Sequence, residues 1–185
     1  TQWIDFTKSN FQEVISNQKP AMIWIESPTN PLLKIIDIEE ICNLSNKLGI
    51  PVVVDNTFAT PLLQRPLKLG ATLSLTSTTK YINGHSDALG GAVCTESSVW
   101  KDKLNFAQKA LGLNPSPFDC WLITRGIKTL PLRLERQINN ASKIANQLAD
   151  NPIIKSVRYP FRNDHPQCKL AKKQMTLGGA IVTAT

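Results

Sequence analysis

Ser77, Thr79 and Lys80 form the part of the chain whose residue types are best suited to chemistry. They follow residues 71–75, which are expected to form a strand. Ser77 and Thr79 place hydroxyl donors on a tight backbone, and such donors suit a bound phosphate. Because Lys80 comes next, its amine would stand beside whatever the phosphate anchors, as an aldehyde cofactor requires in order to form a Schiff base. Alone, the stretch is ambiguous, since a lysine after a strand is usually a solvated surface residue.

Two further strand ends carry polar residues that fit the same cofactor. Asp55 ends the apolar run 51–54, and Asn30 lies in the loop after the apolar run 21–25. Ligands of open parallel sheets bind outside the carboxyl ends of the strands, so we expect these ends to converge. A carboxylate such as Asp55 would keep a pyridine nitrogen protonated, and an amide such as Asn30 would face the ring hydroxyl. These roles predict pyridoxal 5'-phosphate (PLP), although each residue alone is also typical of a turn or a helix cap.

The segment between the first two strand ends predicts an α/β fold. Asp37, with Glu40 three residues later, is typical of a helix start, and Gly49 is typical of a helix end. Apolar residues in 38–48 have helical spacing. Strand, helix and strand together have the length of a right-handed parallel crossover, and 90–94 adds a further short strand.

The remaining segments predict mainly helices. Residues 1–19 predict a short strand followed by a helix, and 99–111 predicts another helix. Residues 118–149 show a nearly continuous helical pattern, which Pro131 should kink or divide. Residues 153–159 predict a strand that opens a second subdomain.

The composition indicates a globular protein: of 185 residues, 42% are apolar and 19% are charged. The formal charge of +7 is scattered among acidic residues without a nucleic-acid-binding signature, so we expect no nucleic-acid partner. A basic binding module remains the non-enzymatic alternative. No apolar run approaches the roughly 18 residues of a membrane span, and no signal peptide is visible. We therefore expect a cytoplasmic protein without a membrane partner.

The four cysteines, Cys42, Cys94, Cys120 and Cys168, lie far apart and form no metal-ligand spacing. We expect reduced thiols and no bound metal. The chain starts at Thr1 without a methionine and stops inside an apolar run, so we expect it to be a piece of a longer protein.

Three motifs at the predicted strand ends resemble the Cys/Met metabolism family of PLP-dependent enzymes: E-S-P-T-N-P at 26–31, V-D-N-T-F at 54–58 and S-T-T-K-Y-I-N-G-H-S-D at 77–87. Further matches to that family occur at 116–122, 125–130, 159–160 and 165–167. The resemblance covers nearly the whole chain, and the lysine motif is its most specific part. The chain departs from the family pattern at Thr72, where aspartate is usual, and at Thr76, where a larger residue is frequent.

The resemblance implies PLP-dependent transferase fold type I, with an aspartate-aminotransferase-like large domain that is truncated at both ends. Its mostly parallel sheet would lie between helices. Residues 1–149 would be the partial PLP-binding domain, including the long central helix, and 150–185 would start the C-terminal small domain. A homotetramer with shared active sites is also implied, and the chain alone could then be inactive.

By the same resemblance, Lys80 would bond to the cofactor and afterwards shuttle protons. Asp55 would pair with the pyridine nitrogen, and Asn30 would contact the ring oxygen. Ser77 and Thr79 would hold the phosphate.

Two further residues receive roles by resemblance: Thr57 would sit beside the ring, and Glu26 would lie near the substrate. That substrate would be a sulfur amino acid or an activated homoserine. The 116–119 and 165–167 stretches favour γ-elimination of cystathionine to cysteine, 2-oxobutanoate and ammonia. Cystathionine γ-synthase or O-acyl-homoserine sulfhydrylase chemistry is the alternative, with cystathionine β-lyase and methionine γ-lyase ranked below it. A nucleotide-binding dehydrogenase is disfavoured, because no Gly-x-Gly-x-x-Gly opens a helix.

Overall fold

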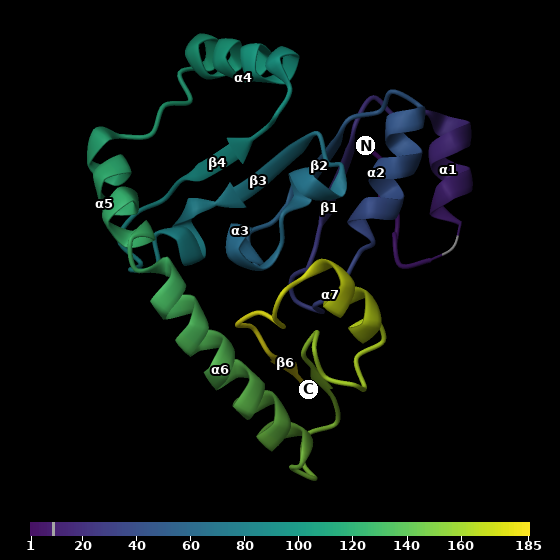
Figure 1. Ribbon diagram of the computed structural model, residues 1–185, viewed down its shortest axis with the longest axis vertical. Coiled ribbons are helices and arrows are strands. Elements are labelled where there is room, and N and C mark those ends of the chain that lie inside the picture. Colours follow the sequence, from purple (N-terminus) through teal and green to yellow (C-terminus); the bar gives the residue numbers. More distant parts are fainter. Residues whose placement is uncertain (9) are drawn as a thin grey trace.

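The computed structural model describes residues 1–8 and 10–185, and its centre is a four-stranded sheet (Figure 1). The strands are β1 (Ile23–Glu26), β2 (Val52–Asp55), β3 (Leu73–Ser77) and β4 (Gly91–Cys94), in the spatial order β1-β2-β3-β4. β1, β2 and β3 are parallel, and β4 pairs antiparallel with β3. The predicted α/β class and mostly parallel sheet are confirmed.

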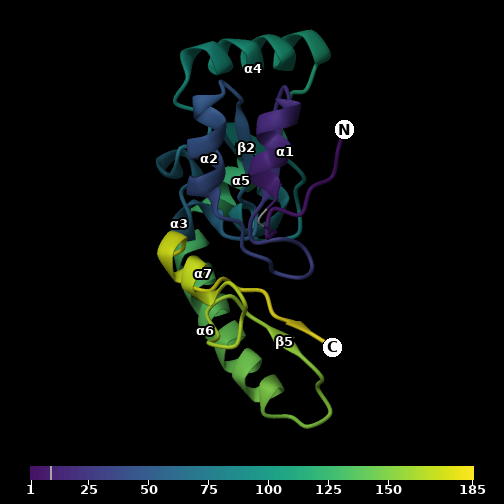
Figure 2. The same ribbon diagram turned by 90° about the vertical axis from the view of Figure 1, so that its right-hand side faces the viewer.

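Helix α2 (Ile38–Lys47) makes the predicted crossover between β1 and β2. The backbone N–H of Glu40 donates to Asp37 Oδ1 at 2.9 Å, which is the predicted N-terminal cap. Ile38 and Ile41 are buried in a core that α2 and helix α1 (Phe11–Gln18) form against the strands. Figure 2 shows both helices beside β2.

Of the strand and helix predicted over residues 1–19, only the helix is confirmed. Helix α1 is present, but residues 1–8 contain a turn and no strand. Ile4 and Phe6 still pack against the core of α1 and α2, so apolar burial rather than strand pairing explains this stretch.

The connection from β2 to β3 contains two short elements that the sequence patterns did not predict. They are α3 (Thr60–Leu63) and the 3-10 helix η1 (Pro66–Leu69). After β3 the chain enters a π-helical turn, η2 (Thr78–Ile82), which contains Lys80.

Pro131 divides the long helical pattern as predicted. Helix α5 (Pro117–Ile127) ends before Lys128, and α6 (Leu130–Ala149) then begins with Pro131 in its first turn. A proline is tolerated there because the N–H groups of a first turn have no partner within the helix. In Figure 1, α6 descends from the end of α5 past the C-terminal segment.

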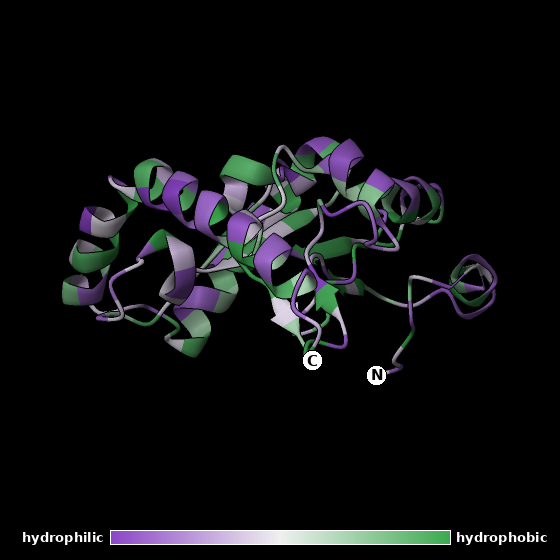
Figure 3. Ribbon diagram, turned by 90° about the horizontal axis from the view of Figure 1, so that it is seen from below, coloured by the Kyte–Doolittle hydropathy of each residue, from purple (hydrophilic) through white to green (hydrophobic). Residues whose placement is uncertain are grey.

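A second core lies beyond the carboxyl ends of the strands and joins α3, α6 and helix α7 (Cys168–Gln174). Leu63, Leu134 and Ala171 are buried in it. Hydrophilic and hydrophobic stretches alternate along the helix ribbons (Figure 3). This pattern is typical of helices that bury one face in a core and expose the other to solvent.

Helix α4 (Ser98–Leu111) and strand β4 are the least buried elements. No residue of α4 is buried, and all four residues of β4 are exposed. Phe106 on α4 is 74% exposed, and Trp24 on β1 is 56% exposed. Among the residues that the structure describes, α4 therefore has no fully buried apolar face.

The C-terminal segment forms the two-stranded ladder of β5 (Val157–Arg158) and β6 (Thr183–Ala184). The strand expected over 153–159 is shortened to two residues, because Ile153 is 83% exposed and has no ladder partner. The basic cluster at 169–173 lies on α7, where Lys173 Nζ is 2.6 Å from Glu39 Oε2.

Within residues 1–8 and 10–185, no helix has both the length and the hydropathy needed to cross a membrane. The same residues contain no cluster of metal-ligating side chains.

His165 joins the C-terminal segment to the loop after β1. Its ring is 5% exposed, Nε2 donates to the Leu33 carbonyl at 3.1 Å, and Nδ1 accepts from the Gln167 N–H at 3.2 Å. This pairing requires a neutral ring. Burial lowers the pKa of His165 below its usual 6.5, and Arg158 also lowers it, whereas the Leu33 carbonyl and Asp164 raise it.

We predict that His165→Gln reduces the loss of stability in acid. The unfolded chain binds a proton near pH 6.5 while the folded chain resists it, so the wild type loses stability as pH falls below about 6.5. Urea unfolding of both proteins at several pH values would show a stability difference that moves in favour of the variant toward lower pH. A parallel decline of the two curves would contradict this account.

Candidate active site

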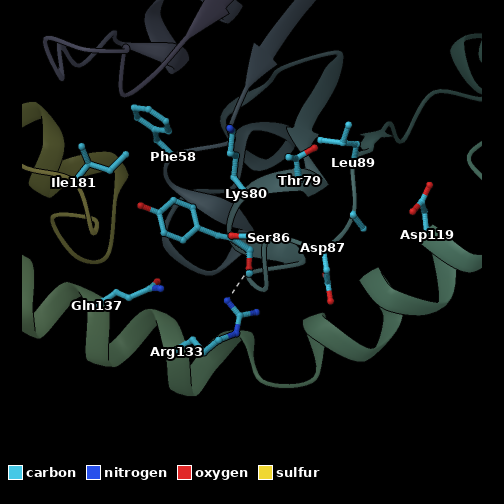
Figure 4. A pocket seen from close by; sticks show the side chains of 13 residues that line it. Phe58, Thr79, Lys80, Ser86, Asp87, Leu89, Asp119, Arg133, Gln137 and Ile181 are labelled. Atoms are coloured by element: carbon cyan, nitrogen blue, oxygen red, sulfur yellow. Dashed lines mark hydrogen bonds between the residues drawn. The ribbon is translucent and has the colours of Figure 1, made fainter.

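Lys80 lies three residues beyond the end of β3, inside η2. Its backbone (φ −89°, ψ −117°) departs from helical values, so the turn bends at the lysine itself. The side chain is exposed and lines a hollow of about 750 Å³. In Figure 4 the Lys80 side chain points away from Arg133 and Gln137 on α6, and its amine ends beside Phe58.

Of the seven predicted site residues, Lys80 and Thr79 line this hollow. Its other walls come from separate parts of the chain, including Phe58, Arg133 and Ile181. The hollow is therefore formed only when η2, α6 and the C-terminal segment pack together.

Asp55, Thr57 and Ser77 are connected by hydrogen bonds. Asp55 Oδ1 accepts from the Thr57 hydroxyl at 2.6 Å and from the Thr57 N–H at 3.0 Å. The Ser77 N–H donates to the same hydroxyl oxygen at 2.8 Å. Thr57 thus fixes the Asp55 carboxylate and ties it to the end of β3, while no hydrogen bond among the described residues engages Asp55 Oδ2.

Glu26 lies level with Asp55, because the two residues are partners in the parallel β1–β2 register. Glu26 Oε2 accepts from the Asn30 N–H at 3.3 Å. Burial raises the pKa of Glu26 and the nearby Asp55 charge raises it further, while the Asn30 N–H opposes both. Asn30 is exposed, and within the described structure its side chain makes no hydrogen bond to Asp55.

Thr79 is held by Gly90. Its hydroxyl oxygen accepts from the Gly90 N–H at 3.0 Å and donates to the Gly90 carbonyl at 3.3 Å. The hydroxyl has one proton, so binding an anion would require it to leave the longer of these contacts. Ser77 has no such competing contact within the structure described here.

Arg133 is a residue of this site that the sequence analysis did not identify. From α6 its guanidinium donates to the Tyr81 carbonyl at 3.0 Å and to the Gly126 carbonyl at 2.9 Å. It therefore satisfies carbonyls at the ends of both η2 and α5. Desolvation by burial lowers the pKa of Arg133. A charged residue beside an apolar helical stripe gives no clear signal for this role in the sequence.

The turn after Lys80 is braced by Asp87. Its carboxylate accepts from Asn83 Nδ2 at 2.8 Å and from Arg125 at 2.7 Å. The Asn83 hydrogen bond is the largest cause of the lowered pKa of Asp87, and Arg125 adds to it. Gly126 packs so closely on this turn that an added Cβ would lie 2.1 Å from the Asn83 carbonyl oxygen. The shape of this turn is thus explained by packing within the chain.

The donors at the strand ends fit PLP. A fixed carboxylate suits a protonated ring nitrogen, and Asp55 has an oxygen to offer it. The Ser77 hydroxyl and the Lys80 amine lie within four residues of each other, as a phosphate and an aldehyde on one small molecule require. The structure brings Asp55, Thr57 and Ser77 together directly, whereas the Asn30 side chain is not brought into contact with them.

The chain is similar to known proteins over nearly its whole length. The family model described as Cys/Met metabolism PLP-dependent enzyme matches residues 1–185. A cystathionine beta-lyase from Coxiella burnetii is 43% identical over 182 residues, which cover 98% of this chain and 47% of that protein. A probable cystathionine gamma-synthase from Herpetosiphon aurantiacus is 48% identical over 162 residues, covering 88% and 51%.

The fold is also that of solved relatives. A cystathionine gamma-lyase from Micromonospora echinospora superposes with a TM-score of 0.95 at 41% identity, covering 98% of this chain and 48% of that one. The chain thus spans about half the length of the relatives it matches.

We predict that Gly126→Ala destabilises the protein by about 1 to 3 kcal/mol, because the new methyl group would meet the Asn83 backbone. The sign is diagnostic, since glycine to alanine in an unobstructed helix stabilises by about 1 kcal/mol. Asn139→Ala, at an exposed position of α6, is the control and should change stability by less than about 0.5 kcal/mol. Urea unfolding measures both, and a stabilised Gly126→Ala protein would refute the close packing.

Proposed function

Because the chain belongs to the Cys/Met metabolism family of PLP-dependent enzymes, we propose that it is the lysine-bearing part of a trans-sulfuration enzyme. The observation that carries the proposal is the hydrogen-bonded line from Asp55 through Thr57 to Ser77, and Ser77 lies three residues before Lys80. It provides a fixed carboxylate, a free hydroxyl and an amine at adjoining strand ends.

Lys80 is the residue proposed to bond to the cofactor aldehyde and then to act as the base. When bound, PLP supplies an electron sink for negative charge on the substrate carbon. Lys80 Nζ, which is accessible in the hollow, would take a proton from that carbon and return it to another atom. The bend of η2 at Lys80 directs this side chain away from α6.

Asp55 is proposed to hold a proton on the pyridine nitrogen. Thr57 occupies Oδ1 with two hydrogen bonds, which leaves Oδ2 to face the ring. Thr57 is therefore proposed to act through Asp55, as a positioning residue, rather than by contacting the ring.

The remaining predicted residues are proposed in supporting roles. Ser77 and Thr79 would donate to the phosphate, with Thr79 exchanging its contact to the Gly90 carbonyl. Asn30 would have to turn its exposed side chain toward the ring oxygen. Glu26, whose pKa is raised by burial, would lie near the substrate.

The proposed reaction of the whole protein is γ-elimination of cystathionine to cysteine, 2-oxobutanoate and ammonia. The alternative is γ-replacement on an activated homoserine, since relatives named as lyases and as synthases are about equally similar. Product analysis with cystathionine, and with O-succinylhomoserine plus cysteine, distinguishes the two. We also propose residues 1–149 and 150–185 as parts of two domains, and a homotetramer with shared sites.

We predict that borohydride reduction of the PLP-treated whole protein fixes the cofactor on Lys80, because its amine is the one beside the phosphate-binding hydroxyls. Peptide mapping would locate the label, and Lys80→Ala should abolish it and lower kcat by at least about a thousandfold. Lys128→Ala, at an exposed lysine on the turn between α5 and α6, is the matched control and should keep the label. A label spread over surface lysines would refute the proposed site.

We predict that Thr57→Val weakens PLP binding and lowers stability by about 1 to 3 kcal/mol, because the Ser77 N–H and Asp55 each lose a buried partner. Thr57→Ser keeps the hydroxyl and should behave nearly as the wild type. Fluorescence titration with PLP and urea unfolding measure the two effects. Equal PLP affinity in the valine and serine variants would exclude the positioning role.

A further inference from the structure

Gln64 joins the ends of β1 and β2 from a buried position. It follows α3 and is 1% exposed. Its side-chain Nε2 donates to the Ser27 carbonyl at 2.8 Å and to Asn56 Oδ1 at 2.9 Å. Ser27 comes directly after Glu26, and Asn56 comes directly after Asp55. One amide group therefore bridges the first residue beyond each strand.

Asn56, directly after β2, also hydrogen-bonds back to Gln64. Asn56 Nδ2 donates back to the Gln64 carbonyl at 2.9 Å, and Asn56 is itself 1% exposed. Two buried amides thus hold each other, and neither has room to exchange its partner for bulk water.

The C-terminal segment is connected to the same group through Gln174, the last residue of α7. Its Nε2 donates to Gln64 Oε1 at 3.1 Å and to the Ile36 carbonyl at 2.9 Å, with a longer contact of 3.4 Å to Ser27 Oγ. Its Oε1 accepts from the Ile38 N–H at 3.4 Å. The loop after β1 is therefore held between Gln64 and Gln174.

We propose that Gln64 is a positioning residue that sets the spacing of the Asp55 and Asn30 strand ends for the cofactor ring, and that Gln174 couples this spacing to the C-terminal segment. The inference rests on the proposed function, in which Asp55 and Asn30 face different atoms of one rigid ring. A rigid ring requires the two strand ends to keep a fixed separation.

The chemistry of the contacts requires an amide at position 64. The side chain must donate twice, to Ser27 and Asn56, and accept once, from Gln174. A carboxylate has no hydrogen to donate, and an apolar residue has neither donor nor acceptor. Gln64 does not line the hollow beside Lys80, so its effect on the cofactor would pass through the strand ends.

The test uses Gln64→Glu in the whole protein, because glutamate keeps the shape and removes both donors. Gln174→Glu removes the donors at the other end of the bridge. Gln147→Glu, at an exposed position of α6, is the matched control. The readouts are the dissociation constant for PLP added to the apoprotein and the pH titration of the visible absorbance of the bound cofactor.

We expect both bridge variants to bind PLP about tenfold more weakly and to shift the pH midpoint of the absorbance titration, while borohydride still fixes the cofactor on Lys80. The control should match the wild type in all three readouts. A rearranged ring environment would produce the spectral shift, whereas a general loss of stability would not.

The inference is overturned if folded variants bind PLP with wild-type affinity and an unchanged titration. If Gln64→Glu does not fold, Gln174→Glu decides, because Gln174 is only half-buried and its loss is better tolerated. A wild-type protein that carries no label on Lys80 would instead refute the proposed function, and this inference with it.

Discussion

The parallel register of β1, β2 and β3 is the constraint on which the site depends. Backbone hydrogen bonds place Glu26 opposite Asp55 and Asp55 opposite Leu75. If the pairing of β2 with its neighbours shifted by one residue, Asp55 would point to the other face of the sheet and a valine would take its place at the candidate site. Because the apolar core of α1 and α2 lies on one face, such a slip would also expose Val52 and Val54. The core and the site therefore enforce the same alignment.

Buried polar groups hold the strand ends where the backbone ladder stops. Just beyond β1 and β2 the backbone ladder continues through one residue on each strand, and Thr57, Asn56 and Gln64 add hydrogen bonds from their side chains. Each is at least nine-tenths buried, and a lost partner would leave a polar atom unsatisfied. This cost makes the arrangement of the strand ends specific, which is what a small ligand with several fixed contacts needs.

The turn that carries Lys80 is stabilised by residues of other helices. Arg133 and Gly126, both far along the chain, contact its carbonyls and its backbone. The π-helical turn is thereby kept in place without burying the lysine, whose amine stays accessible in the hollow. Rigid support beneath an accessible side chain is what a site that positions a cofactor would need.

The sequence alone determined the strands of the sheet and the crossover helix, because these depend on local patterns, and it supplied the candidate site residues. The capping pair at Asp37 and Glu40, the apolar runs and the division at Pro131 all act over a few residues. Lys80, Asp55 and Ser77 were candidates because of their places near strand ends: Asp55 and Ser77 end β2 and β3, and Lys80 lies three residues beyond β3. The family model that matches 1–185 supports the assignment to the family. The missing N-terminal strand shows the limit, since apolar residues can be buried without pairing.

Only the tertiary structure decided which groups touch. Thr57 contacts Asp55 nearby and Ser77 at a distance of 20 residues in the sequence. Gln64 connects the ends of β1 and β2, and Arg133 contacts Tyr81, which lies 52 residues earlier. The long-range contacts among these have no local signature, because a polar side chain in a helix or a loop has the same sequence appearance whether it faces solvent or a distant carbonyl. Packing of the second core chose among those environments, and it thereby set the geometry in which the predicted residues could act.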